Sequence, residues 1–187
     1  MCPALKTVRP EMRPALAATA RRLSRFALLL AGMIPLAIVI QFLFFDPSLF
    51  PVPYGMASLL ADLAWDGSQR LLGAVVALLP ASGVTVALLA AARICREYAK
   101  GGLFSDAVLA AYRRLGIALA ATTLLHWVHP TLLGLALALT LPPGKRFVTV
   151  GVSSDDLLMA LVTGLVFLLG AVMQVAQEVQ ADNAEIV

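Results

Sequence analysis

The sequence predicts an all-α protein that crosses a membrane four times, as a four-transmembrane-helix bundle with both termini in the cytoplasm. Hydrophobic residues make up 60% of the 187-residue chain and charged residues only 13%, and the mean hydropathy is +0.90. A soluble fold of this length cannot bury so much apolar surface. Four apolar runs are long enough to cross the hydrocarbon core as helices, which takes about 20 residues. Lipid must therefore cover much of the surface of the protein.

Each predicted span is a nearly uninterrupted apolar run. The four spans are residues 26–45, 71–92, 115–141 and 157–176. The first is too long for the apolar core of a signal peptide and no A-x-A cleavage site follows it, so we expect it to remain as an anchor. The longest connections are an outer loop of residues 46–70 and a cytoplasmic hairpin of residues 93–114. Neither is long enough for a soluble domain, which usually needs about 50 residues, so residues 1–187 are expected to form a single membrane domain.

The positions of the basic residues predict the orientation of the spans. Lys and Arg are retained on the cytoplasmic side of a membrane. Most of them lie in the N-terminal segment and in the connection between the second and third spans: Lys6, Arg9, Arg13, Arg21, Arg22, Arg25, Arg93, Arg96, Lys100, Arg113 and Arg114. The other two loops carry only Arg70, Lys145 and Arg146. Both termini are therefore expected on the cytoplasmic side.

The cytoplasmic hairpin is expected to be helical on both arms. The second helix runs on past its apolar span until Gly101 and Gly102, and Ser105 then caps a new helix that leads into the third span. The cations of this hairpin are suited to anionic lipid headgroups or to an acidic protein partner. With the acidic tail, they define a candidate cytoplasmic contact surface: Arg96, Lys100, Arg113, Arg114, Asp182 and Glu185.

Three prolines lie near the middle of predicted spans, at positions 35, 80 and 130. A proline inside a helix removes one backbone hydrogen bond and tends to kink the helix. Kinks at these positions would shape a cavity, which leaves open a small transporter or channel subunit with a cavity near the prolines and the intramembrane histidines. Prolines are also common in membrane helices without such a role.

The candidate intramembrane polar site consists of His126 and His129 in the third span. His126 lies about eleven residues into this span, or roughly 16 Å at about 1.5 Å per residue, and the i, i+3 spacing puts both rings on one helix face. Such a pair can relay protons or bind a metal. Because no Cys, Asp or Glu lies inside a predicted span, we expect neutral structural or sensing histidines and no metal or cofactor. Asp155 and Asp156 precede the fourth span, where the helix dipole favours them.

The sequence contains no motif of an enzyme that we can recognise. It has no G-x-S-x-G, H-E-x-x-H, phosphate-binding loop or dinucleotide fingerprint. The cations form no stripe with interleaved aromatic residues, so direct binding of nucleic acid is not expected either. These observations favour a membrane protein without catalytic activity.

Short motifs lie in the cytoplasmic hairpin and at the C-terminus. The hairpin contains KGGLFS at residues 100–105 and RRLG at 113–116, and the last helix and tail contain QVAQE at 174–178 and ADNAEIV at 181–187. These motifs resemble the DUF2975 family of small bacterial membrane proteins, with its G-x-[IL]-F-S turn, its closing helix and its acidic tail, although the usual E-N-D-L-T pattern of the tail is loosened.

The resemblance implies a multi-pass protein of the bacterial inner membrane with no assigned activity. Members of this family are often encoded beside a small helix-turn-helix regulator. The resemblance therefore implies a membrane-embedded regulatory or sensing partner of a small cytoplasmic transcriptional regulator.

Overall fold

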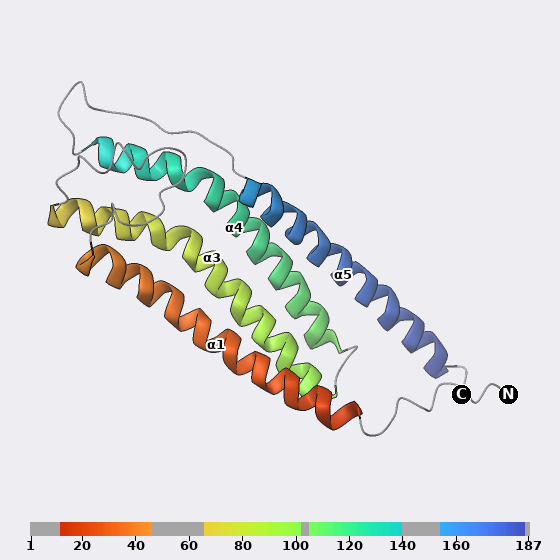
Figure 1. The fold of residues 1–187 in the computed structure, drawn as a ribbon. Coiled ribbons are helices and arrows are strands. Elements are labelled where there is room, and N and C mark those ends of the chain that lie inside the picture. The colour runs from red at the N-terminus through yellow and green to blue at the C-terminus, as the bar shows by residue number, and fades with distance from the viewer. Residues whose placement is uncertain (1–11, 46–65, 102–104, 140–153, 186–187) are drawn as a thin grey trace.

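The computed structural model describes residues 12–45, 66–101, 105–139 and 154–185, all of which belong to four helices or their ends. The helices are α1 (Met12–Phe44), α3 (Gly67–Ala99), α4 (Asp106–Ala138) and α5 (Ser154–Glu185) (Figure 1). All four are long and apolar enough to span a membrane. The all-α fold with four transmembrane helices is therefore confirmed. Most of the predicted outer loop lies outside the described residues.

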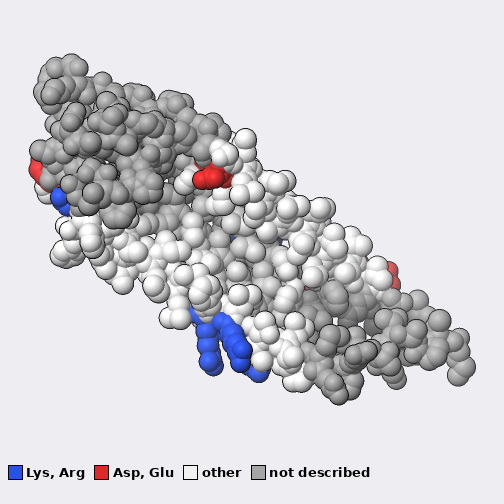
Figure 2. Space-filling model, viewed as in Figure 1, with Lys and Arg blue, Asp and Glu red and all other residues white. Residues whose placement is uncertain are grey.

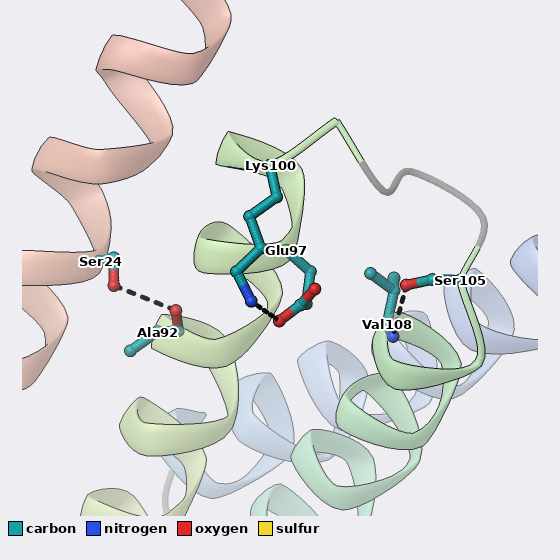
Figure 3. A network of polar contacts seen from close by, with 6 residues as sticks. All are labelled: Ser24, Ala92, Glu97, Lys100, Ser105 and Val108. Carbon is teal, nitrogen blue, oxygen red and sulfur yellow. Dashed lines mark hydrogen bonds and ion pairs between the residues drawn. The ribbon is translucent and has the colours of Figure 1, made fainter.

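At the predicted helical hairpin, α3 ends at Ala99 and α4 begins at Asp106. Gly101 adopts a positive φ of 88°, a conformation that favours glycine, and its N–H donates to the carbonyl of Tyr98 at 3.1 Å. The next helix begins after Ser105, whose hydroxyl oxygen accepts the N–H of Val108 at 3.4 Å (Figure 3). A glycine terminator and a serine cap thus set the ends of both helices, as their residue types predict.

The beginning of α3 is stabilised by a capping box. Asp66 accepts the backbone N–H of Gln69 at 2.8 Å, and the side chain of Gln69 accepts the backbone N–H of Asp66 at 3.3 Å. Arg70 in the same turn donates to the carbonyl of Phe45 at 2.7 Å. The end of α1 and the beginning of α3 are therefore joined by Arg70, at the end of the predicted outer loop.

The helices lie side by side in chain order (Figure 1). The extensive contacts are those of α1 with α3, α3 with α4, and α4 with α5. Each helix runs antiparallel to the one before it, so the beginning of α1 and the end of α5 lie at the same end of the row (Figure 1). We call this end the basic end, because it carries Arg21, Arg96 and Arg113 from three different helices.

Small residues bring α1, α3 and α4 close together. Ala27 and Ala31 of α1 are buried, and the hydroxyl of Ser24 donates to the carbonyl of Ala92 in α3 at 3.1 Å (Figure 3). On the other side of α3, a Cβ atom at Gly83 would collide with the side chain of Thr122 in α4. Close approach of this kind is what small residues permit in membrane helices.

The three prolines do not interrupt their helices. Pro35, Pro80 and Pro130 all lie inside continuous helices, and Pro80 and Pro130 are buried. Their rings therefore pack inside the row, where neighbouring helices can accommodate the lost backbone hydrogen bond.

Helix α5 is shifted along α4 toward the basic end. Its first turn lies beside the middle of α4, next to His126, and not beside the end of α4 at Ala138 (Figure 1). The shift corresponds to about twelve residues, or roughly 18 Å at 1.5 Å per residue. The register continues regularly, since Thr163 lies beside Thr123 and Phe167 beside Gly116. This shift decides which polar groups meet.

Candidate functional site

The two histidines lie together on α4, as the i, i+3 spacing predicts. Their ring centroids are 6.5 Å apart and the ring planes are 15° from parallel. The side chain of His126 is 45% exposed, whereas Nε2 of His129 is buried and has no hydrogen-bond partner within the described part of the chain. The ring of His126 is thus accessible from outside the protein, whereas the Nε2 atom of His129 is not.

A buried carboxylate from another helix completes this cluster. Asp156, in the first turn of α5, is fully buried, and its Oδ1 lies 3.8 Å from Nε2 of His126. Its neighbour Asp155 is exposed. In the sequence these two residues form an equivalent acidic pair at a helix N-terminus. In the structure they differ, because Asp155 points to the surface and Asp156 is buried beside His126. We call His126, His129 and Asp156 the intramembrane cluster.

The threonines near the histidines bond to the backbone of their own helix. Thr122 donates to the carbonyl of Ala118 at 2.7 Å, and Thr123 donates to the carbonyl of Leu119 at 2.9 Å. The hydroxyl of Thr123 also lies 3.4 Å from that of Thr163 in α5. The contact between Thr123 and Thr163 thus joins α4 to α5 about one turn from the intramembrane cluster.

The imidazole of His126 and the carboxylate of Asp156 lie within ion-pair distance at 3.8 Å, which is too long for a hydrogen bond. A protonated His126 beside Asp156 forms an ion pair, and a neutral His126 still offers a nitrogen to a protonated carboxyl group. A metal is less suited: within the described ranges, no group of three or more His, Cys, Asp or Glu residues is arranged to hold an ion. The absence of metal stays a prediction, which metal analysis of the purified protein tests.

The candidate cytoplasmic contact surface lies at the basic end. Arg96 comes from the last turns of α3, Arg113 and Arg114 from the first three turns of α4, and Asp182 from the end of α5, and all four are exposed. Lys100 is paired with Glu97 at 2.7 Å (Figure 3). Of Glu185 the structure describes the backbone only. The fold thus brings together residues that are up to 86 positions apart in the sequence, between Arg96 and Asp182.

Two polar contacts join the helices at this end. The hydroxyl groups of Tyr98 in α3 and Tyr112 in α4 lie 3.0 Å apart. The amide of Gln177 in α5 donates to Oδ1 of Asp106 in α4 at 2.6 Å. The sequence offers no signal for either pair, because each depends on how far neighbouring helices slide along one another.

A groove of about 800 Å³ lies between α4 and α5 near the basic end. Its polar lining includes Arg113, Arg114 and Gln174, and its apolar lining includes Ile117 and Phe167. Figure 2 shows that the described atoms in the middle of the molecule are mostly white, with a group of blue side chains on the half that carries the beginning of α1 and red atoms at the start of α5. Blue and red atoms also lie at the opposite end, so the described charges lie mainly toward the two ends.

The opposite end carries one described cation, Arg70, and its guanidinium is engaged with carbonyls at the end of α1. At the same end, the backbone N–H of Gln69 and then the hydroxyl of Ser68 lower the pKa of Asp66 by hydrogen bonding. Arg70 and Asp66 thus both stabilise helix ends. The two candidate sites are therefore the intramembrane cluster and the basic end.

Comparison with known proteins identifies the family. No curated protein and no solved structure matches the chain. A family model described as "Protein of unknown function (DUF2975)" matches residues 10–187. Since this match covers nearly the whole sequence, the chain belongs to the DUF2975 family.

Proposed function

We propose that this protein is a non-enzymatic membrane protein that binds a small cytoplasmic protein of the helix-turn-helix type. The observation that carries the proposal is the convergence of exposed charged residues from three helices on the basic end. Arg96, Arg113 and Arg114 supply positive charge and Asp182 supplies negative charge. Such a mixed surface suits a soluble partner, because complementary charges speed association and select the partner.

The proposed topology places the basic end in the cytoplasm. Among the described Lys and Arg residues, only Arg70 lies at the other end. A bacterial inner membrane retains positively charged segments on its inner side. This orientation supports the proposal, since a transcriptional regulator is available only on that side.

The intramembrane cluster is the proposed sensing part. It joins α5 to α4 through His126 and Asp156, and the far end of α5 carries Asp182 of the contact surface. A change in protonation or in the surrounding lipid that weakens this contact would shift α5 along or away from α4. The spacing of charges at the basic end would then change, which is how a membrane event could reach a soluble partner.

We do not favour a transporter or channel. The groove lies between α4 and α5 near the basic end, and its lining includes neither a mid-span proline nor either histidine. This groove is therefore not the cavity near the prolines and histidines that a transporter or channel would need.

The test first asks whether a small helix-turn-helix protein is encoded beside the gene, and then measures binding of that purified protein to the full-length membrane protein in detergent. We expect Arg96→Gln combined with Asp182→Asn to reduce binding at least tenfold, as loss of paired interfacial charges does. Arg21→Gln combined with Arg22→Gln is the matched control, since these exposed residues lie at the same end on α1. Unchanged binding after loss of residues 182–187 together with Arg113→Gln and Arg114→Gln would exclude this surface.

A further inference from the structure

We infer that the groove between α4 and α5 binds an anionic phospholipid, with the phosphate at Arg113 and Arg114 and an acyl chain against Ile117 and Phe167. This inference does not depend on the proposed protein partner. It rests on the shape, the polarity and the position of the groove.

The charged side chains of the groove lie toward one end, where Leu109 and Ala110 also line it, and the other end is apolar. Asp106, Arg113 and Gln174 line the part nearest the basic end. Ile117 and Phe167 line the part that lies further toward the middle of the helices. A phospholipid has the same order, with a charged headgroup joined to apolar chains.

The groove lies at the depth of the membrane boundary. From Asp106 to Ile117 it extends along eleven residues of α4, or roughly 16 Å at about 1.5 Å per residue. The apolar span predicted for this helix begins at residue 115, inside that interval. Arg113 and Arg114 therefore lie at the level of lipid headgroups, and Ile117 lies at the level of the chains.

The charges in the groove favour an anion. Arg113 and Arg114 are two cations, and a guanidinium binds phosphate oxygens in a two-point geometry. The one acidic residue in the lining, Asp106, lies almost two turns before Arg113, and its Oδ1 accepts a hydrogen bond from Gln177 at 2.6 Å. The net charge of the lining is thus positive, which suits a headgroup that has no cation of its own.

The location also decides between a lipid and a peptide as the occupant. Ile117 and Phe167 are 54% and 46% exposed and belong to faces that the apolar spans turn toward the bilayer. A polar peptide chain would have to bury unsatisfied backbone groups at this depth, at a cost of several kcal/mol for each. A lipid chain has no such groups.

The floor of the groove depends on a small residue. Gly170 of α5 faces Tyr112, and a Cβ atom there would lie 3.7 Å from Cβ of Tyr112, an ordinary contact. The first carbon of a larger side chain at Gly170 therefore fits beside Tyr112, and the further atoms of a leucine are expected to occupy the groove that Gly170 lines. Gly164 on the same helix has nothing within 4 Å of an added Cβ and does not line the groove, so it supplies a matched control.

The test measures lipid retained by the full-length protein after purification in micelles that contain equal amounts of phosphatidylglycerol and phosphatidylcholine. Native mass spectrometry counts the bound lipids. We expect about one phosphatidylglycerol for each chain, preferred over phosphatidylcholine by on the order of tenfold. Gly170→Leu should abolish this retention although it leaves the charge unchanged, and Gly164→Leu should not.

A second pair of variants separates the groove from the general charge of the surface. Arg113→Gln with Arg114→Gln should remove the preference for phosphatidylglycerol, whereas Arg21→Gln with Arg22→Gln should preserve it. Equal losses in both double variants, or full retention in Gly170→Leu, would overturn the inference. Failure of the proposed protein partner is recognised separately, because Arg96→Gln alters partner binding and leaves the groove intact.

Discussion

The contact between α3 and α4 differs in kind from the contact between α4 and α5. In the first, backbones approach through small residues, as at Gly83, where Thr122 occupies the space of a side chain. In the second, the contacts are made mainly by longer side chains: Asp156 approaches His126, and the ring of Phe167 lies over Gly116. The apolar window of α5 is only 6% buried, against 33% for α4.

This difference teaches which part of the molecule is able to move. Close backbone packing has many small contacts and leaves no room for adjustment. Contacts between long side chains can be broken and remade by rotation about single bonds. We therefore expect α1, α3 and α4 to form the more rigid part, and the proposed sensing role assigns the movement to α5.

The largest expected effect follows from filling the space at Gly83. Gly83→Leu should lower the free energy of unfolding by about 3 kcal/mol, because the Thr122 side chain and backbone would have to withdraw. Unfolding of the purified protein in detergent by heat or denaturant measures the loss. Gly32→Leu on α1 is the control, since an added Cβ there meets nothing within 4 Å. Equal stability of the two variants would contradict the close packing of α3 against α4.

A smaller effect is expected from the contact that holds the first turn of α5. Asp156→Ala should cost about 2 kcal/mol, since it removes a fully buried polar group and leaves its partners unsatisfied. Asp155→Ala should change stability by less than about 0.5 kcal/mol, because that side chain is exposed.

The register of α5 against α4 can be tested with a disulfide. The hydroxyl oxygens of Thr123 and Thr163 lie 3.4 Å apart in the native protein. A disulfide in the variant that combines Thr123→Cys with Thr163→Cys should therefore form readily, and it should form more slowly when Asp156 is also replaced.

If Asp155→Ala proves the more damaging of the two, the assignment of the buried carboxylate is wrong. If the disulfide fails to form on mild oxidation of the membranes, the register of α5 against α4 is wrong. The two measurements thus test the cluster and the shift of the helix separately.

A still smaller effect is expected where the obstacle is a flexible ring. A Cβ atom at Gly116 would lie 2.9 Å from the edge of the Phe167 ring, which is 46% exposed and can turn outward. Gly116→Ala should therefore cost less than about 1 kcal/mol, and the higher helix propensity of alanine offsets part of this. The melting temperatures of Gly116→Ala and Gly83→Ala, measured side by side, give the comparison. A larger loss of stability in Gly116→Ala than in Gly83→Ala would show that α5 is held as rigidly as α3.

The smallest effect concerns a helix end outside both interfaces. Hydrogen bonds to the carboxylate lower the pKa of Asp66 below its ordinary value of 3.8 in the folded protein. The cap therefore stabilises the fold above pH 3.8, and this contribution is lost as the pH falls through the lowered folded-state pKa. The melting temperatures of the native protein and of Asp66→Ala should differ at neutral pH and converge in acid; a constant difference would contradict the role of the charge.

Much of the fold could be predicted because its causes are local. The lengths of the apolar runs, the glycine at position 101 and the cap at Ser105 act within a few residues of themselves, and the helices begin and end accordingly. The spacing of His126 and His129 likewise puts them on one face of one helix, since the helical period is the same everywhere.

The partners across helices could not be predicted in this way. Asp156 has the composition and position of an ordinary residue at a helix N-terminus, and nothing in its neighbours distinguishes it from Asp155. Only the shift of α5 by about twelve residues along α4, or roughly 18 Å, brings it to His126, and small residues at regular spacing fit more than one such shift.

The sequence by itself determined that this protein is helical, that it has four apolar spans and that its charges gather at helix ends, because these properties follow from hydrophobic period, length and capping. The tertiary structure decided that α5 is displaced toward the basic end, that one carboxylate of two is buried beside a histidine, and that a groove opens between α4 and α5. These three features depend on how the surfaces of two helices fit together. Each such surface is formed by residues that are far apart in the sequence, so no local pattern reveals the fit.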